Sequence, residues 1–204
     1  METLVAGRIS AAVYGRPCRG ERVSGDIGVL LQRDGHVLAV LADVLGHGRR
    51  AHGLAVTLPE HVAGTVGVDP DRIVASLHAA LAGSLGAAVS CVSINASSGA
   101  LTFAGVGNVG LRLFGPHAAS AEKSLVPQPG TAGRVMDPPR LTSERLVPGR
   151  RAVLFTDGLK SRFGVADYAG ILHDHPTDLC AELVDRFGKV HDDATVLVIA
   201  HDPE

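Results

Sequence analysis

The sequence lacks the features that mark several classes of protein. It has no Trp, and aromatic residues make up 3% of its 204 residues, so the core must be built from Val, Leu, Ile and Ala. No apolar run approaches the ~18 residues of a membrane span. The first residues, METLVAGRISAAVYG, show no basic segment followed by a long apolar core. We therefore expect no signal peptide, no membrane association and a cytoplasmic location.

Cysteine content and charge exclude further classes. The three cysteines (Cys18, Cys91 and Cys180) lie far apart without CxxC spacing, which fits free thiols in a reducing compartment. The chain has 19 basic and 21 acidic residues, so no basic excess points to nucleic acid as a partner. The length favours a single domain over residues 1–204.

Apolar runs of strand length indicate the organisation of the chain. We expect strands at 27–32, 36–42, 87–95, 100–105, 110–114, 151–156 and 194–200. Helices are expected at 48–66, at 69–85 with Asp69 as N-cap, and at 177–187, which Gly188 would close. The stretch 115–148, rich in Pro, Gly and Ser, predicts loops with one or two short strands. Strands in two groups with helices clustered between them favour a layered, largely antiparallel α/β sandwich.

Four aspartates lie where apolar runs begin or end. Asp26 precedes IGVLLQ, Asp43 ends HVLAVLA, Asp157 ends AVLFT, and Asp192 lies just before ATVLVIA. Any one of them could be an ordinary turn residue. Together, with glycines beside three of them, they suit a ligand site, because glycine allows close backbone approach.

The register of one hairpin brings two of these carboxylates together. Asp34-Gly35 is a strong signal for a two-residue hairpin turn. If this turn has no bulge, Asp26 and Asp43 face each other with Cβ atoms about 5 Å apart. Like charges so placed are destabilising unless a cation joins them, and an all-oxygen site favours Mg²⁺ or Mn²⁺ over Zn²⁺.

In order along the chain, SGDIG, ADVLGHG, FTDGL and HDDATVLV resemble the spaced motifs of the PPM-type metal-dependent phosphatases. The resemblance is greatest to the SpoIIE-type branch, whose central hairpin and glycine-asparagine turn are similar to GAAVSCVSI and AGVGNV. Within that branch the chain resembles members that lack sensor domains. The resemblance covers about residues 20–200 and implies an α-β-β-α sandwich, two mainly antiparallel sheets flanked by helices, with a two-metal site at one end.

The resemblance also implies roles for individual residues. Asp43 would bridge two Mn²⁺ or Mg²⁺ ions, and the backbone carbonyl of Val44 would complete one shell. Asp26 would serve the same ion as Val44, directly or through water, and Asp157 and Asp192 would hold the other. Asp193 lies where many relatives have asparagine, so it is interpreted as structural or as a support for the ligands.

Two ions a few Å apart activate water and hold phosphoryl oxygens, so the protein needs no nucleophilic side chain. Asp43 and Asp157 would then be catalytic through the ions that they hold. His47 is a candidate general acid, but the histidine of eukaryotic relatives follows the bridging aspartate by two residues, where this chain has Leu45. The alternative for His47 is a role at the start of the following helix.

The sequence thus predicts a protein serine/threonine phosphatase. By resemblance its substrates would be phosphorylated STAS-domain proteins of a stressosome or partner-switching pathway. One alternative is a catalytically silent module that keeps the fold to bind a phosphorylated partner. A nuclease-like phosphoesterase is a second alternative, against which the lack of a basic groove signature argues.

Overall fold

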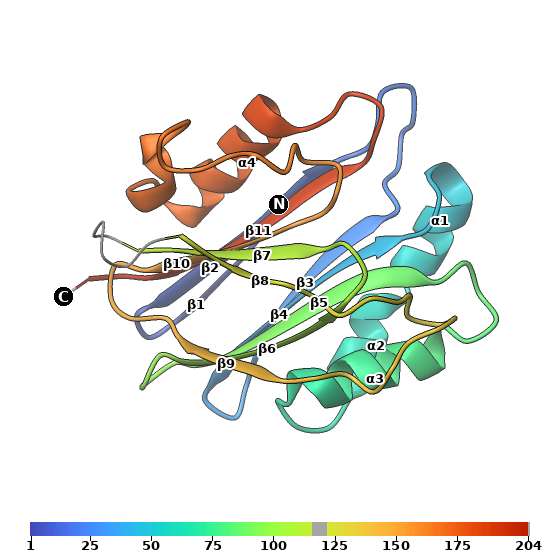
Figure 1. The fold of residues 1–204 in the computed structure, drawn as a ribbon, viewed down its shortest axis with the longest axis horizontal. Coiled ribbons are helices and arrows are strands. Elements are labelled where there is room, and N and C mark those ends of the chain that lie inside the picture. The colour runs from blue at the N-terminus through green and yellow to red at the C-terminus, as the bar shows by residue number, and fades with distance from the viewer. Residues whose placement is uncertain (116–121, 204) are drawn as a thin grey trace.

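Two antiparallel β-sheets face each other, and helices cover the outer side of each sheet (Figure 1). The structure is a computed structural model that describes residues 1–115 and 122–203. The predicted α-β-β-α sandwich is confirmed.

Each sheet is built from strands that pair antiparallel with their neighbours. In spatial order, the first sheet contains β1 (Glu2–Ala6), β2 (Ile9–Arg16), β11 (Ala194–His201), β10 (Arg151–Phe155), β7 (Gly110–Phe114) and β8 (Lys123–Leu125). The second contains β3 (Asp26–Arg33), β4 (His36–Val44), β5 (Ala87–Asn95), β6 (Ala100–Val106) and β9 (Thr142–Arg145).

The helices divide between the two outer faces. The second sheet is covered by α1 (Gly48–Ala55), α2 (Leu58–Gly64) and α3 (Pro70–Ala80). The first is covered by α4 (Pro176–Phe187), which packs on β2 and β11 and follows the short 3₁₀ helix η2 (Ala169–Leu172). Within the described residues, no helix has both the length and the apolar character that crossing a membrane requires.

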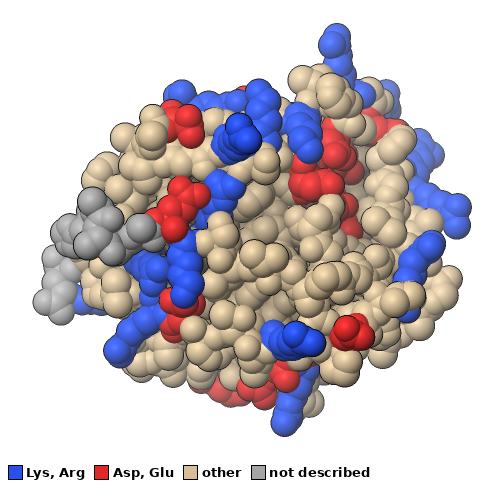
Figure 2. All heavy atoms as spheres, viewed as in Figure 1, with Lys and Arg blue, Asp and Glu red and all other residues tan. Residues whose placement is uncertain are grey.

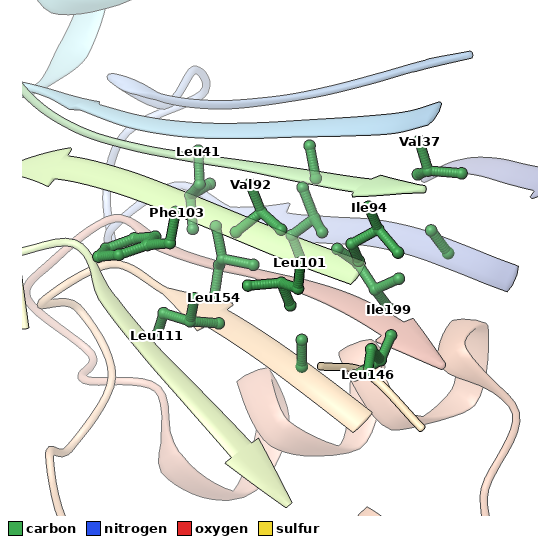
Figure 3. Close-up of a cluster of buried hydrophobic side chains, with 14 of the residues drawn as sticks. Val37, Leu41, Val92, Ile94, Leu101, Phe103, Leu111, Leu146, Leu154 and Ile199 are labelled. Atoms are coloured by element: carbon green, nitrogen blue, oxygen red, sulfur yellow. The ribbon is translucent and has the colours of Figure 1, made fainter. Parts of the chain in front are cut away.

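The central core fills the space between the sheets. Figure 3 shows Leu41, Val92 and Phe103 of the second sheet with Leu154 and Ile199 of the first, all at most 2% exposed. Alternate residues along each strand point to the opposite face, where separate apolar layers pack against the helices. Apolar packing on both faces therefore fixes the strands, and residues at the strand ends have well-defined positions.

All seven predicted strands match the structure. Those at 87–95 and 110–114 agree with β5 and β7 to the residue, and the others agree within two residues at each end. The stretch 115–148 holds two short strands, β8 and β9, as expected, although residues 116–121 lie outside the described residues.

The N-terminal hairpin of β1 and β2 was not predicted. Strand β2, with the sequence ISAAVYGR, lies between β1 and β11 and is buried on both faces for most of its length. Its residues therefore show no apolar-polar alternation, and Ala and Gly have low strand propensity.

The helix expected over 48–66 is wrong as a single helix. The chain forms α1 and α2, which are separated at Val56 and Thr57. Pro59 follows in the first turn of α2, and a proline lacks the N–H that would continue the hydrogen bonding of α1. The break therefore has a local cause that the sequence contains.

The helix expected over 69–85 ends early, at Ala80. Asp69 takes the N-cap position as predicted, but its side chain accepts no hydrogen bond from the helix. Its Oδ2 lies 3.4 Å from Arg72 Nε instead. The helix expected at 177–187 is α4, which begins one residue earlier and ends before Gly188.

Candidate metal centre

Asp26 and Asp43 lie directly opposite each other across β3 and β4, as the hairpin register predicts. The turn contains only Asp34 and Gly35, with φ of 47° and 73°, and no bulge follows it. Positive φ at both central residues is the signature of a type I′ turn, whose twist matches that of the strands. The local sequence at the turn therefore fixes the pairing of two carboxylates at the other end of the hairpin.

The other two aspartates lie at the ends of two central strands of the first sheet. Asp157 follows β10 and Asp192 precedes β11, and these strands pair antiparallel with Phe155 opposite Val196. The C-terminal end of β10 and the N-terminal end of β11 therefore lie side by side.

Thr156, directly after β10, connects the two sheets. Its hydroxyl donates a hydrogen bond of 2.8 Å to Asp26 Oδ2 in a buried environment. The hydroxyl oxygen of Thr156 in turn accepts the backbone N–H of Thr195 at 3.1 Å. Thr156 thus ties the carboxylate of the second sheet to β10 and β11 of the first.

The pKa of Asp43 responds to the charges of the other three carboxylates. Burial, together with the charges of Asp26, Asp157 and Asp192, raises the pKa of Asp43 to about 8. Such mutual effects require short separations in a poorly screened region. The four aspartates therefore lie within electrostatic reach of one another, and their role as metal ligands stays a prediction.

The pKa values of Asp26 and Asp192 are raised as well. Burial raises the pKa of Asp26 to about 7, although hydrogen bonds from the side chains of Thr156 and Thr195 act in the opposite direction. Burial also raises the pKa of Asp192, and the charge of Asp157 adds to this effect. Acidic groups with raised pKa values cluster at functional sites.

Asp157 is oriented by two residues from other elements. Asn108 Nδ2, in the turn between β6 and β7, donates to Asp157 Oδ2 at 2.7 Å. Lys189 Nζ donates to the backbone carbonyl of Asp157 at 2.5 Å. The sequence gives no signal for this role of Lys189, since the contact depends on how the chain returns from α4 to the sheet.

Asp193 has a structural role. Its two carboxylate oxygens accept the backbone N–H groups of Cys18, at 2.7 Å, and Gly25, at 2.6 Å. Both hydrogen bonds are buried, and they hold the segment that leads into Asp26. This agrees with the interpretation of Asp193 as structural.

Gly158 explains how Asp157 and Asp192 approach each other. A Cβ at residue 158 would lie 1.7 Å from the backbone oxygen of Asp193. Only glycine lets the backbone after β10 pass so close to the segment before β11.

The remaining predicted site residues lie on the α1 side. Val44 is fully buried, and its carbonyl oxygen would lie 3.3 Å from a Cβ built on Gly25. The side chain of His47 is 70% exposed at the N-cap of α1, and its Nδ1 lies 3.2 Å from Glu21 Oε1. His47 is thus placed with Glu21, and its role as general acid stays a prediction.

The donor set fits a hard divalent cation. Among the described residues, Asp26, Asp43, Asp157 and Asp192 form no ion pair with Lys or Arg. As the described side chains are arranged, no three of His, Cys, Asp or Glu lie close enough together to hold a metal ion. Asp26 and Asp43 form an opposed pair, and Asp157 and Asp192 lie at the neighbouring strand ends. Carboxylate oxygens are the ligands that Mg²⁺ and Mn²⁺ prefer.

Figure 2 shows acidic side chains gathered on the surface between α4 and α1, with basic side chains on either side. The negative charge is therefore local, and it contrasts with the nearly balanced charge of the whole chain. A local field of one sign in a recess attracts ions of the opposite sign.

Comparison with known proteins decides the family. The family model of Stage II sporulation protein E (SpoIIE) matches residues 33–202. The chain belongs to the SpoIIE family. This confirms the predicted membership of the SpoIIE branch of PPM-type phosphatases. No curated protein sequence matches the chain.

Solved structures support the fold of this SpoIIE-family chain. It is similar to RsbX in complex with magnesium, with a TM-score of 0.81 and 20% identity, over 97% of this chain and 98% of that one. It is also similar to the PP2C phosphatase domain of SpoIIE from Bacillus subtilis, solved with a regulatory fragment. That match has a TM-score of 0.74 and 19% identity, over 96% of this chain and 62% of the other. A chain from a study of the bacterial stressosome matches with a TM-score of 0.80 and 20% identity, covering 94% and 98%.

Proposed function

We propose that this chain is a protein serine/threonine phosphatase that depends on two Mn²⁺ or Mg²⁺ ions. The observation that carries the proposal is the burial of Asp26 opposite Asp43, beside Asp157 and Asp192, with no ion pair from Lys or Arg to any of the four within the described residues. Membership of the SpoIIE family and the fold shared with a magnesium-bound relative support the same reading.

The aspartates would divide between two ions. Asp43 lies opposite Asp26 and also feels the charges of Asp157 and Asp192, so it is the residue best placed to be shared. Asp26 and the carbonyl of Val44 would complete one shell, and Asp157 and Asp192 the other. Bound cations supply Lewis acidity for phosphoester hydrolysis.

The chain's own residues position the ligands. Thr156 fixes one oxygen of Asp26, and Asn108 fixes one oxygen of Asp157. Polar groups that orient metal ligands raise metal affinity and hold the geometry that catalysis needs. The chain thus contributes a preformed frame on both sheets.

The cysteines do not offer another nucleophile. All three thiols are buried, and burial raises the pKa of Cys91 and Cys180. Thiols with raised pKa values stay protonated at neutral pH and react poorly. This favours attack by water over a covalent phosphocysteine mechanism.

As substrates we propose phosphorylated STAS-domain proteins of a partner-switching or stressosome pathway. The support is the family resemblance, together with the likeness in fold to RsbX and to a chain from a stressosome study. We also propose that residues 1–204 act as one domain, in the cytoplasm, where the three free thiols would stay reduced.

An aryl phosphate assay tests the function. We expect turnover with Mn²⁺ and none in chelator. Asp43→Asn and Asp157→Asn should each lower kcat/KM by about 100-fold or more, since each removes the negative charge of a direct ion ligand, a greater loss than the roughly 10- to 100-fold typical of residues that only orient ligands. Asp185→Asn, an exposed aspartate of α4, should retain full activity and serves as the matched control.

Two results would contradict the proposal. Full activity in chelator would exclude the metal mechanism. Mn²⁺ binding without turnover of aryl phosphate or of any phosphoprotein would favour the catalytically silent module.

A further inference from the structure

A cavity of about 500 Å³ opens beside Asp157. Its lining includes the buried Phe155 and Leu159 and the exposed Lys160 and Arg162. Asn108 and Asp157 of the candidate metal centre line the same cavity. The cavity therefore adjoins the candidate metal centre on the side of Asp157, and Asp26 and Asp43 do not line it.

Contacts with the first sheet fix the segment that carries the two exposed basic residues. Arg112 Nη1 donates to Phe163 O at 2.5 Å, and Nη2 donates to Ser161 O. The guanidinium of Arg112 also lies 4.6 Å from the centre of the Phe163 ring, a cation–π contact. In addition, the backbone N–H of Lys160 donates to Phe187 O at 2.9 Å. The basic residues thus project from a fixed backbone.

Positive charge is in excess around this cavity. Lys160, Arg162 and Lys189 line it, against the single carboxylate of Asp157. Lys189 is committed in part to the Asp157 carbonyl. Within the described residues, neither Lys160 nor Arg162 forms an ion pair with Asp or Glu. Their charges are available to a ligand.

We propose that Phe155, Leu159, Lys160 and Arg162 form a subsite, here called the basic subsite, for an acidic side chain next to the phosphorylated residue of the substrate. The proposal rests on the proposed function and adds a substrate class to it. An Asp or Glu side chain would place its CH₂ groups against Phe155 and Leu159 and its carboxylate between the two cations. A free phosphate ion has no apolar part to use the buried rings and methyl groups.

Three phosphoserine peptides test the basic subsite. They differ only in the residues that flank the phosphoserine, which are Glu, Ala or Lys. Binding is measured by fluorescence anisotropy in chelator, and kcat/KM is measured with Mn²⁺. We expect the wild type to favour the Glu peptide over the Lys peptide about tenfold in both, with the preference falling as salt rises.

Matched variants locate the preference. Lys160→Glu combined with Arg162→Glu should reverse the order of the peptides. Arg72→Glu combined with Arg145→Glu makes the same change of net charge on α3 and β9. This control pair should keep the wild-type order.

Equal binding of the three peptides would overturn the basic subsite, as would an unchanged preference in the Lys160→Glu, Arg162→Glu variant. Displacement of all three peptides alike by inorganic phosphate, without a preference among them, would show a bare anion site and also overturn it. Absence of aryl phosphate turnover in the wild type would instead contradict the proposed function. The binding measured in chelator would still decide the subsite.

Discussion

Asp43 combines burial with the charges of four neighbouring carboxylates, those of Asp26, Asp157, Asp192 and Asp193. These effects raise its pKa to about 8, and the pKa of Asp26 opposite it to about 7. Unfolded aspartates titrate near 3.8, so the folded protein without metal holds protons that the unfolded chain releases. Ionisation of these carboxylates as the pH rises therefore destabilises the metal-free folded protein.

The sign of the resulting pH dependence follows from linkage. Between pH 4 and pH 8 the folded state binds more protons than the unfolded state, so the free energy of unfolding falls as pH rises. In chelator we expect a slope of up to roughly 1.4 kcal/mol per pH unit for one such group. Asp43→Asn should flatten the slope and stabilise the metal-free protein at pH 8, as urea unfolding at several pH values would measure.

Asp185→Asn is the control for this prediction, because Asp185 is exposed on α4. Its unfolding free energy should keep the wild-type slope. A metal-free wild type whose stability does not change between pH 5 and pH 8 would contradict the electrostatic account of Asp43.

Asn108 acts on the metal centre through Asp157. Its amide holds Asp157 Oδ2 at 2.7 Å, so Asn108→Ala should lower Mn²⁺ affinity by about 10- to 100-fold with little change in stability. Calorimetric titration with Mn²⁺ measures the first effect and urea unfolding the second.

Asn95→Ala provides the contrast for Asn108. Asn95 Oδ1 accepts hydrogen bonds from the backbone and hydroxyl groups of Ser97 and Ser98 in the β5–β6 turn. Its loss should lower stability and leave Mn²⁺ affinity unchanged. Equal Mn²⁺ affinity in wild type and Asn108→Ala would show that the amide has no positioning role.

At the scale of elements, the close passage of β10 and β11 depends on Gly158. Gly158→Ala places a methyl group against the Asp193 carbonyl, which lies 1.7 Å from the ideal Cβ position. We expect a loss of about 2–4 kcal/mol in unfolding free energy, because backbone has to move. Mn²⁺ affinity should fall as well, since Asp157 and Asp192 would separate.

Gly53→Ala is the matched control within a helix. A Cβ at Gly53 of α1 meets nothing within 4 Å. Alanine should therefore stabilise the protein by about 0.5–1 kcal/mol. A Gly158→Ala protein as stable as wild type would contradict the account of this crossing.

Elements with local signals could be predicted from the sequence. The Asp34-Gly35 turn fixed the pairing of Asp26 with Asp43, and the apolar runs located the strands within two residues. Strand β2 could not be recognised, since its burial depends on β1 and β11 on either side. The break between α1 and α2 was missed although Pro59 gives a local reason for it.

The candidate site divides in the same way. The four aspartates were found from their positions at strand ends. Thr156 and Lys189 were not, because one acts across the two sheets and the other reaches back from the end of α4. Contacts between distant elements leave no spacing pattern along the chain.

At the scale of the whole molecule, the candidate metal centre joins the two sheets. Asp26 and Asp43 belong to the second sheet, and Asp157 and Asp192 lie at the edge of the first. Ions bound among them would therefore stabilise the sandwich as a unit. At a Mn²⁺ concentration 100 times the Kd, we expect a gain of about 2.7 kcal/mol, measured as a rise in Tm.

The combined variant Asp157→Asn, Asp192→Asn should lose this gain, because it leaves ligands on one sheet only. A rise in Tm equal to that of the wild type would show that Mn²⁺ stabilises the protein from another place.

The most direct test is an anomalous difference map from crystals grown with Mn²⁺ and measured at the manganese edge. The account predicts two peaks, with Asp43 contacting both, Asp26 and Val44 on one side and Asp157 and Asp192 on the other. Absence of a peak among these residues, or an unchanged peak in Asp43→Asn crystals, would contradict it.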